Sequence, residues 1–289
     1  MQRFLPPLRI HSWGGLGSQL FAIALAEELK VIFPKRSLKI ILHTGGVTRR
    51  LPEVVGLFPN FDYLYEDDFQ SNVDTPQDLS KRKNIDFRKT IKFLLSFLGF
   101  LAECNDDGST KKLLPWVFSI RGHYSYRTID SNFLKGLYEI FQSFDSSNVS
   151  NIKQACVVHY RLGDLLTLTE KNPISAQSIK LEYSRIQGQI NFSKLVVFSD
   201  SPSEVGERFS TPFLGEVVIL DLSVILVIAN SIHAKYFIGT SSKISFWIAG
   251  IRAVTIENPS SLPAANVKQY EKLAAGSLNL ISPYVTHSQ

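Results

Sequence analysis

Short apolar stretches alternate with helical patterns along most of the chain, and this alternation constrains the fold more than any other feature. Nearly uninterrupted apolar runs predict strands at residues 8–11, 37–42, 155–160, 195–199, 217–222, 236–239 and 253–257. Apolar side chains at helical spacing predict helices at residues 19–32, 175–189, 202–209, 223–234 and 244–251. Buried strands separated by helices are typical of parallel sheets covered on both faces. The sequence therefore predicts an α/β protein.

The length of 289 residues is enough for two such units. A serine- and asparagine-rich stretch at residues 139–153 is the most linker-like part of the chain, and it puts a domain boundary near Asn151. We expect two Rossmann-like domains facing a cleft, residues 1–150 and residues 151–289. Ligands of open α/β sheets bind at the carboxyl ends of the strands, so the candidate site residues are those that follow the predicted strands.

Composition excludes several classes of protein. With 44% hydrophobic and 20% charged residues, the chain is too apolar for disorder and too charged for a polytopic membrane protein. Only two cysteines, Cys104 and Cys156, exclude a disulfide scaffold and a four-cysteine zinc site, and we expect both to be reduced. The longest apolar runs are shorter than the roughly 20 residues that span a bilayer. We therefore expect a cytoplasmic protein that is soluble or peripherally bound to a membrane.

A basic stretch leads directly into an aromatic-rich apolar run within residues 81–101. Its cations are Lys81, Arg82, Lys83, Arg88, Lys89 and Lys92. Its apolar side chains are Phe93, Leu94, Leu95, Phe97, Leu98, Phe100 and Leu101. One interpretation is a surface that lies on the anionic inner face of a membrane. The other is a solvated charged stretch followed by a core helix.

A glycine-rich turn, Gly-Gly-Leu-Gly-Ser-Gln from residue 14 to residue 19, joins the first strand to the first helix. Glycines allow a ligand to approach the backbone closely, and a helix N-terminus offers N–H groups to an anion. A dinucleotide fingerprint needs a third glycine where Leu20 stands and an acid near His43, and a P-loop needs a lysine that is absent. A tight turn without a ligand is the alternative. The candidate binding residues are Gly15, Gly17, Ser18 and Gln19.

Polar residues follow three strands of the second half. The first of these strands ends in His159, Arg161 and Asp164, and a guanidinium at a strand end suits a diphosphate. His159 could instead be a hydrogen-bonded core histidine. The other two strand ends contribute Ser199, Asp200, Thr240, Ser241 and Ser242. Three polar strand ends on one sheet, one of them with an arginine, predict a site for a phosphorylated ligand.

The order of these motifs resembles glycosyltransferase family 11, the α-1,2-fucosyltransferases of the inverting, GT-B-like group. The matching elements are Gly-Gly-Leu-Gly-x-Gln-Leu-Phe from Gly14, His-x-Arg-x-Gly-Asp from His159, Phe-Ser-Asp from Phe198 and a serine-rich segment that ends at Trp247. A glycine-tyrosine segment from Gly122 is also similar. The resemblance spans residues 12 to about 250.

The resemblance implies transfer of a sugar from a nucleotide donor, usually GDP-fucose, with no required metal or other cofactor. It implies that residues 151–289 hold the nucleotide, that residues 1–150 lie on the acceptor side, and that the glycine loop meets the donor phosphates. By motif match, Arg161 neutralises the leaving diphosphate, His159 and Asp164 support it, and the donor pocket is lined by Ser199, Asp200, Ser241 and Ser242, with Thr240 beside them. The acceptor would be a glycan or a lipid-linked oligosaccharide, as in surface polysaccharide or O-antigen synthesis.

The chain departs from the family pattern beside the leaving group. Leu162 replaces a second arginine, Ser18 replaces an asparagine, Ser201 replaces an aspartate, and Thr240 replaces an asparagine. These departures allow a different nucleotide sugar on the same fold. The acceptor hydroxyl also needs a general base, and the sequence offers three candidates without choosing among them: Asp164, Asp200 and Asp221.

Two alternatives come from other classes of protein. The strand, glycine loop and helix at the start of the chain favour a nucleotide-dependent oxidoreductase, against which stand the missing third glycine and acid. The net charge of +5 and pI near 9.1 favour a nucleic-acid-binding protein. However, the basic residues are bunched rather than interleaved with aromatics, and the sequence has no recognised nucleic-acid motif.

Overall fold

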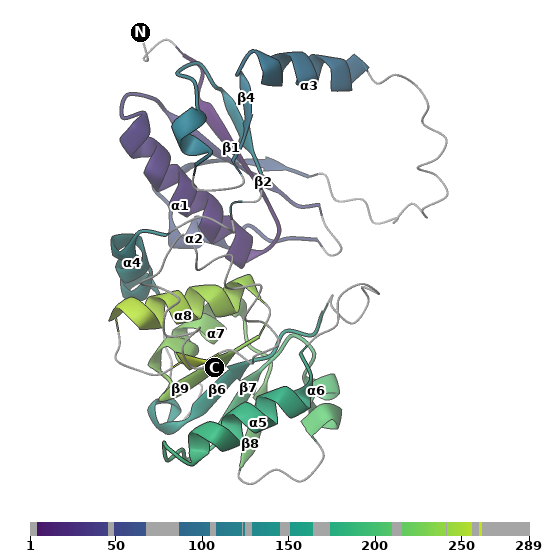
Figure 1. Ribbon diagram of the computed structural model, residues 1–289, viewed down its shortest axis with the longest axis vertical. Helices are drawn as coiled ribbons and strands as arrows, with labels where there is room; N and C mark the ends of the chain where they lie inside the picture. The colour runs from purple at the N-terminus through teal and green to yellow at the C-terminus, as the bar shows by residue number, and fades with distance from the viewer. Residues whose placement is uncertain are drawn as a thin grey trace. The chain divides into compact units, whose positions relative to one another are not determined.

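The fold comes from a computed structural model, which forms two compact units, Met1–Arg127 and Thr128–Gln289 (Figure 1). The structure describes residues 5–45, 49–67, 87–104, 108–122, 124, 129–144, 151–163, 174–209, 216–240, 242–255 and 260–261. The predicted site residues Asp164 and Ser241 and the basic residues 81–83 lie outside this part of the chain. Each unit is an α/β structure with a parallel sheet, as the alternation of strands and helices predicted.

The N-terminal unit is built around a five-stranded parallel sheet in the order β3-β2-β1-β5-β4. Its strands are β1 (Leu8–Trp13), β2 (Leu38–His43), β3 (Asp62–Glu66), β4 (Leu101–Glu103) and β5 (Ser119–Arg121). Its helices are α1 (Leu16–Ile32), α2 (Val54–Leu57), α3 (Phe87–Phe97) and the short 3₁₀ helix η3 (Thr110–Lys112). Apolar residues such as Leu8, Ile10 and Ile40 are fully buried, because α1 covers the central strands.

The C-terminal unit contains a second five-stranded parallel sheet, in the order β10-β9-β6-β7-β8. Its strands are β6 (Cys156–His159), β7 (Leu195–Phe198), β8 (Val217–Leu220), β9 (Tyr236–Gly239) and β10 (Ser260–Ser261). Its helices are α4 (Ser131–Gln142), η5 (Ile152–Gln154), α5 (Ala176–Gln187), α6 (Pro202–Phe209), α7 (Val224–His233) and α8 (Lys243–Thr255). The strand order reverses between β6 and β9, which makes that position the topological switch point of the sheet.

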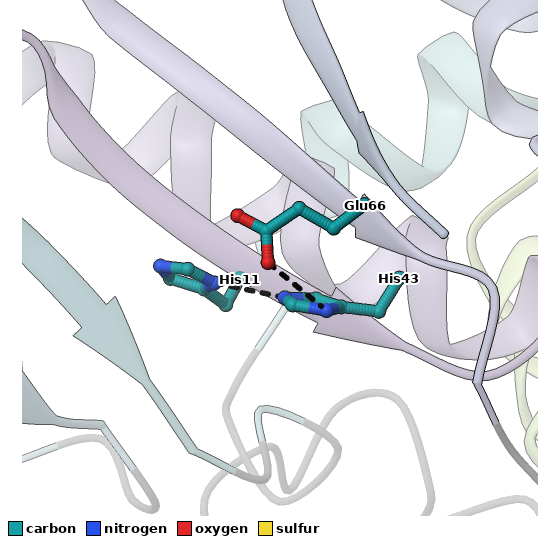
Figure 2. Close-up of side chains that lie close together, drawn as sticks. All are labelled: His11, His43 and Glu66. Carbon is teal, nitrogen blue, oxygen red and sulfur yellow. Dashed lines mark hydrogen bonds and ion pairs between the residues drawn. The ribbon is translucent and has the colours of Figure 1, made fainter. Parts of the chain in front are cut away.

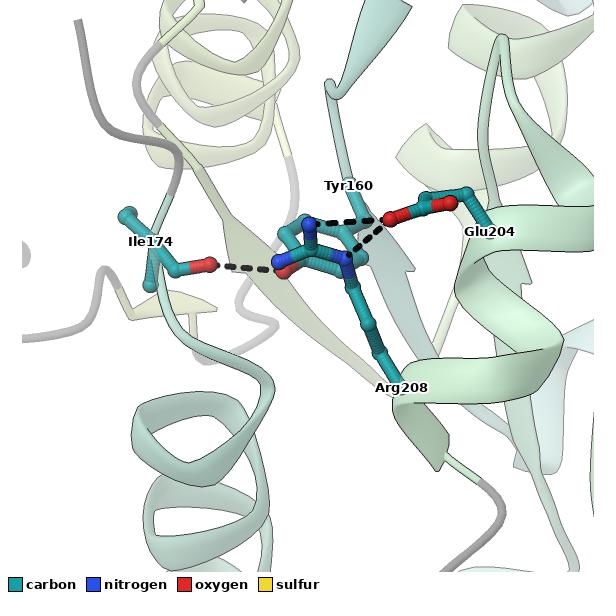
Figure 3. Close-up of polar contacts among 4 residues, drawn as sticks. All are labelled: Tyr160, Ile174, Glu204 and Arg208. Atoms are coloured by element: carbon teal, nitrogen blue, oxygen red, sulfur yellow. Dashed lines mark hydrogen bonds and ion pairs between the residues drawn. The ribbon is translucent and has the colours of Figure 1, made fainter. Parts of the chain in front are cut away.

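Tyr160 anchors the end of β6 in the core of the C-terminal unit (Figure 3). Its hydroxyl donates a hydrogen bond to the carbonyl of Ile174 at 2.6 Å, and burial raises the pKa of this hydroxyl, so it remains a donor. Beside it, Arg208 of α6 donates to Glu204 Oε1 from Nε at 3.2 Å and from Nη2 at 3.0 Å. Tyr160, which lies between His159 and Arg161 in the chain, is therefore held in place by contacts in the core.

The predicted strand at residues 253–257 is wrong where the structure describes it, because α8 continues to Thr255. Arg252 explains the difference. Its side chain is fully buried, and Nη1 donates to the carbonyls of Ser231, Ile232 and Ala234 at 3.0, 3.3 and 2.8 Å. These are carbonyls at the end of α7, which need donors, so a tertiary contact holds a β-branched segment in a helix.

The division between the units precedes α4, whereas the sequence put the boundary after it, near Asn151. Helix α4 packs against α7 and α8 of the C-terminal unit. Leu134, Leu137 and Phe141 form its buried face. The linker-like stretch at residues 139–153 begins in the last turn of this helix and does not coincide with the division between the units.

Helix α3 exposes most of its apolar residues. Phe93 is 73% exposed and Phe97 is 79% exposed, and Leu95 is the only residue of 90–98 that is not exposed. The alternative of a core helix at this position is therefore wrong. Among the described residues, no helix has both the length and the apolar character needed to cross a membrane.

Candidate functional site

The loops that follow β6, β7 and β9 meet at the carboxyl edge of the C-terminal sheet. His159 at the end of β6 is in register with Phe198 on one side and Gly239 on the other. The residues that follow these strands therefore come together, with Arg161 and Thr240 on the two sides of the switch point. Open α/β sheets bind their ligands at this position.

Thr240 joins the loop after β9 to the loop after β6. Its hydroxyl donates to the carbonyl of His159 at 2.8 Å and accepts a hydrogen bond from the backbone N–H of Arg161 at 3.2 Å. Its own N–H donates to Ser245 Oγ at 3.1 Å. Thr240 is 1% exposed. It therefore fixes the backbone on both sides of Tyr160 and sets the direction in which Arg161 leaves the sheet.

Asp200 makes the matching connection from the loop after β7. Its Oδ1 accepts hydrogen bonds from the N–H groups of Leu162 and Gly163, at 3.1 and 3.0 Å. A Cβ on Gly163 would collide with the Asp200 carboxylate, so glycine is required for this close approach. The family resemblance puts Asp200 in the donor pocket, and in the structure its Oδ1 holds residues 161–163, the arginine loop, in place. Ser199, also predicted there, is buried, and its Oγ accepts from the N–H of Ser201 at 3.2 Å.

His159 is a neutral support of this edge. Its Nδ1 lies 2.8 Å from Ser245 Oγ, and burial of the ring lowers the pKa of His159 to about 4. A neutral imidazole brings no positive charge to this edge of the sheet, whereas the partly exposed Arg161 does. Ser245 was missed as a site residue, although the sequence signal was its place in the Ser-Phe-Trp end of the serine-rich segment. Ser242 is buried, and its Oγ accepts from the N–H of Ile244 at 3.1 Å.

The glycine turn in the N-terminal unit is held by the protein's own side chains. Glu53 Oε2 accepts a hydrogen bond from the N–H of Leu16 at 3.0 Å, at the N-terminus of α1. Burial raises the pKa of Glu53. A carboxylate thus already lies where a donor phosphate was expected. The same contact gives no support to the oxidoreductase alternative, because a dinucleotide phosphate needs that helix end.

Gln19 has a similar internal role. Its Nε2 donates to the carbonyls of Gly14 at 3.1 Å and Leu51 at 2.7 Å, and its Oε1 accepts from the N–H of Val54 at 3.1 Å. Gly14 adopts a φ of +101°, which favours glycine. The predicted residues Gly15, Gly17 and Ser18 begin α1 at this turn. The side chain of Gln19 therefore ties the turn to residues 51–54 rather than facing a ligand.

A second polar cluster, which the sequence did not predict, lies at the carboxyl ends of β1, β2 and β3 (Figure 2). His11 Nδ1 lies 2.9 Å from His43 Nε2, and His43 Nδ1 lies 3.6 Å from Glu66 Oε2. Both histidines are buried, whereas Glu66 is exposed. Burial, with Arg121 nearby, lowers the pKa of His11 to about 4. Among the described residues, these three form the group of His, Cys, Asp or Glu side chains that lie close enough together to hold a metal ion.

Comparison with known proteins gives structural likenesses only. No family model matches the chain, and no curated protein matches it. Similar solved structures include POFUT1 in complex with GDP, at 13% identity over 89% of this chain and 98% of that chain, with a TM-score of 0.46. A protein from Listeria monocytogenes described as a UDP-N-acetylglucosamine 2-epimerase has 9% identity over 98% and 91%, with a TM-score of 0.46. ADP-heptose LPS heptosyltransferase II of E. coli has 10% identity over 89% and 84%, with a TM-score of 0.44. These likenesses are distant and do not assign an activity to this chain.

Proposed function

We propose that the protein is a glycosyltransferase that moves a sugar from a nucleoside diphosphate to a hydroxyl of a glycan. The observation that carries this proposal is the anchoring of the Arg161 loop at the switch point of the C-terminal sheet. Thr240 bonds the loop from one neighbouring strand, and Asp200 bonds it from the other. A preorganised cation of this kind suits a diphosphate that gains charge as it leaves.

The donor that best fits the sequence is GDP-fucose. Its support is the order of motifs shared with the α-1,2-fucosyltransferases, in which an arginine occupies the place of Arg161. Leu162 replaces the family's second arginine and is itself fully buried, so it adds no charge to the site. A donor with another base or sugar is therefore the second possibility within the same reaction class.

The proposed reaction is a single displacement with inversion at the sugar C1. The acceptor oxygen forms a bond to C1, the bond from C1 to the diphosphate oxygen breaks, and the acceptor proton passes to a base. Arg161 stabilises the departing diphosphate, and His159 holds the strand end as a neutral hydrogen-bonded group. Oδ1 of Asp200 accepts two backbone hydrogen bonds, which leaves that oxygen poorly suited to be the base. No step requires a metal ion.

A panel of nucleotides tests the class of reaction and the donor together. Purified protein is heated with GDP, UDP, ADP, CMP and their sugar conjugates, and then incubated with GDP-fucose and glycan acceptors. A ligand at 100 times its dissociation constant adds about 2.7 kcal/mol to the free energy of unfolding, which raises Tm measurably. We expect selective stabilisation by GDP and release of GDP on transfer. Stabilisation by UDP alone would replace the donor, and stabilisation by none would contradict the proposed function.

We further propose that α3 attaches the enzyme to an anionic membrane, such as the inner face where lipid-linked acceptors lie. The support is an exposed apolar surface that continues beyond the helix. Trp116 Nε1 donates to the carbonyl of Leu98 at 2.9 Å, which brings this exposed tryptophan next to the exposed Leu98 that follows the helix. Exposed Leu114 packs against Gly99. Aromatic side chains of this kind are enriched at membrane interfaces.

Positive charges accompany this surface. Lys92 lies on α3, and Lys111 and Lys112 of η3 are exposed just before Leu114 in the chain. A basic and aromatic surface matches anionic lipid better than neutral lipid, because each lysine near the surface adds roughly 1 kcal/mol of attraction.

Co-sedimentation with vesicles tests the attachment. We expect the protein to bind vesicles that contain phosphatidylglycerol and to remain free of pure phosphatidylcholine vesicles. The double substitution Phe93→Glu and Phe97→Glu should abolish binding, whereas Leu181→Glu, at another exposed leucine, should leave it unchanged. Equal binding by the double variant and the unsubstituted protein would disprove a role for α3.

A further inference from the structure

Three adjacent strands of the N-terminal sheet bring metal-ligating side chains to one place. His43 at the end of β2 is in register with Glu66 at the end of β3 and with Trp13 at the end of β1. His11 lies two residues before Trp13 and therefore points to the same face of the sheet. The ligand atoms of His11, His43 and Glu66 all lie within 4.8 Å of one another. The pleat and register of the sheet thus place these three groups together.

The separations match what a small divalent ion needs. His11 Nδ1 and His43 Nε2 face each other at 2.9 Å (Figure 2). Zinc binds imidazole nitrogen at roughly 2.0–2.1 Å in a tetrahedral arrangement, which holds two such nitrogens about 3.3 Å apart. To admit the ion, the two rings would have to separate by a few tenths of an ångström and turn so that both lone pairs point at it, in place of the hydrogen bond between them. Glu66 Oε2 lies 3.6 Å from the other ring nitrogen of His43, Nδ1, so this exposed carboxylate must turn to reach the ion.

The surroundings hold the two imidazoles in place. The ring of Trp13 stacks on His43 with centroids 4.1 Å apart and an interplanar angle of 13°. Tyr124 donates its hydroxyl proton to the carbonyl of His11 at 2.7 Å. Histidine ligands of metal sites are commonly held by neighbouring groups; here the stacking constrains the ring of His43, and the Tyr124 bond fixes the backbone of His11.

We propose that His11, His43 and Glu66 bind one divalent ion of the zinc class, with a remaining position open to water. Two imidazoles and a carboxylate form a ligand set that zinc accepts with such an open position. The guanidinium of Arg121, whose Cζ lies 5.7 Å from the centre of the Trp13 ring, opposes a cation here. We therefore expect weaker binding than in a closed structural zinc site. The proposal does not depend on the proposed sugar transfer, which needs no metal.

Calorimetric titration of the untagged, metal-stripped protein with Zn²⁺ tests the site, and Co²⁺ provides a visible spectrum that reports its ligands. We expect one ion per chain. His11→Gln and His43→Gln should each weaken binding at least tenfold, and Glu66→Gln should weaken it and shift the cobalt absorption band. His233→Gln, which removes a histidine of the other unit, is the matched control and should bind as the unsubstituted protein does.

Circular dichroism establishes that each variant is folded before its affinity is compared. If a histidine variant does not fold, X-ray absorption of the zinc-loaded, unsubstituted protein decides the question, with two imidazoles and oxygen expected around the ion. Absence of stoichiometric binding would overturn the proposal. So would undiminished binding by the folded His11→Gln and His43→Gln variants, or a zinc shell with fewer than two imidazoles.

Discussion

Asp200 and Gly163 form a pair in which each residue requires the other. The carboxylate can accept two backbone hydrogen bonds from the arginine loop only because Gly163 has no Cβ to displace it. Hydrogen bonds to a charged acceptor stabilise more than neutral ones do. Because these two bonds hold only the loop, their loss should loosen the loop more than the whole domain. The effect of a substitution here should therefore appear in ligand binding before it appears in stability.

Gly163→Ala should lower kcat/KM for sugar transfer about tenfold or more, because the added methyl pushes the carboxylate away from the loop amides. Steady-state kinetics measure the loss. Gly206→Ala in α6 is the matched control, since a Cβ there meets nothing within 4 Å, and it should leave the kinetics unchanged. Normal kinetics for Gly163→Ala would show that Asp200 does not position the arginine.

At this scale the sequence predicted the residues that follow strands but not their partners. Arg161, Asp200 and Thr240 could be found because each comes directly after an apolar run. The roles of Ser245 and Glu53 could not be predicted, since they depend on contacts with His159 and Leu16, which are distant in the sequence. For the same reason, the contact of Glu53 with the N-terminus of α1 was not expected.

Helices α7 and α8 show how one buried side chain determines an element. Arg252 Nη1 donates hydrogen bonds to carbonyls at the end of α7, and this contact keeps the last turn of α8 helical. The run Ala253, Val254 and Thr255 has strand propensity when taken alone, and the tertiary contact overrides it. Strand β3 was missed for a different reason. It is largely exposed and lacks the continuous apolar run of a central strand.

Arg252→Met should lower the free energy of unfolding by about 3 kcal/mol, because the α7 carbonyls lose a buried charged donor. Urea denaturation followed by circular dichroism gives the value. Arg49→Met, whose partner Asp67 is exposed as Arg49 is, is the control and should change stability by less than about 1 kcal/mol. Equal effects of the two substitutions would contradict an anchoring role for Arg252.

For the chain as a whole, the alternation of strands and helices was sufficient to predict the α/β class and the parallel arrangement of the strands, although β3, β4 and β5 of the N-terminal sheet were not predicted. It was not sufficient to predict the strand order, which depends on which strand pairs with β1 and β6 across long connections. The division between the units was expected near Asn151 from composition. Composition could not show that the buried face of α4 packs with α7 and α8.

Stability should fall as the solution becomes acidic. The folded protein holds the pKa of His159 at about 4, below its ordinary value of 6.5, so the unfolded chain binds the extra proton between these two values. The contribution of His159 is complete above pH 6.5 and is lost as the pH falls toward 4, at roughly 1 kcal/mol per pH unit. Thermal unfolding at several pH values measures the slope. His159→Asn should flatten the curve, and an unchanged slope would contradict the neutral state of His159.

The proposed function requires Arg161 to bind the diphosphate of a nucleotide sugar, and the dissociation constant of GDP measures this contact. Calorimetric titration should show GDP binding to the unsubstituted protein and to Arg185→Ala with the same affinity. Arg161→Ala should retain its Tm and bind GDP at least tenfold more weakly, because a bidentate charged contact is lost. Unchanged GDP affinity in a folded Arg161→Ala protein would show that Arg161 does not bind the diphosphate.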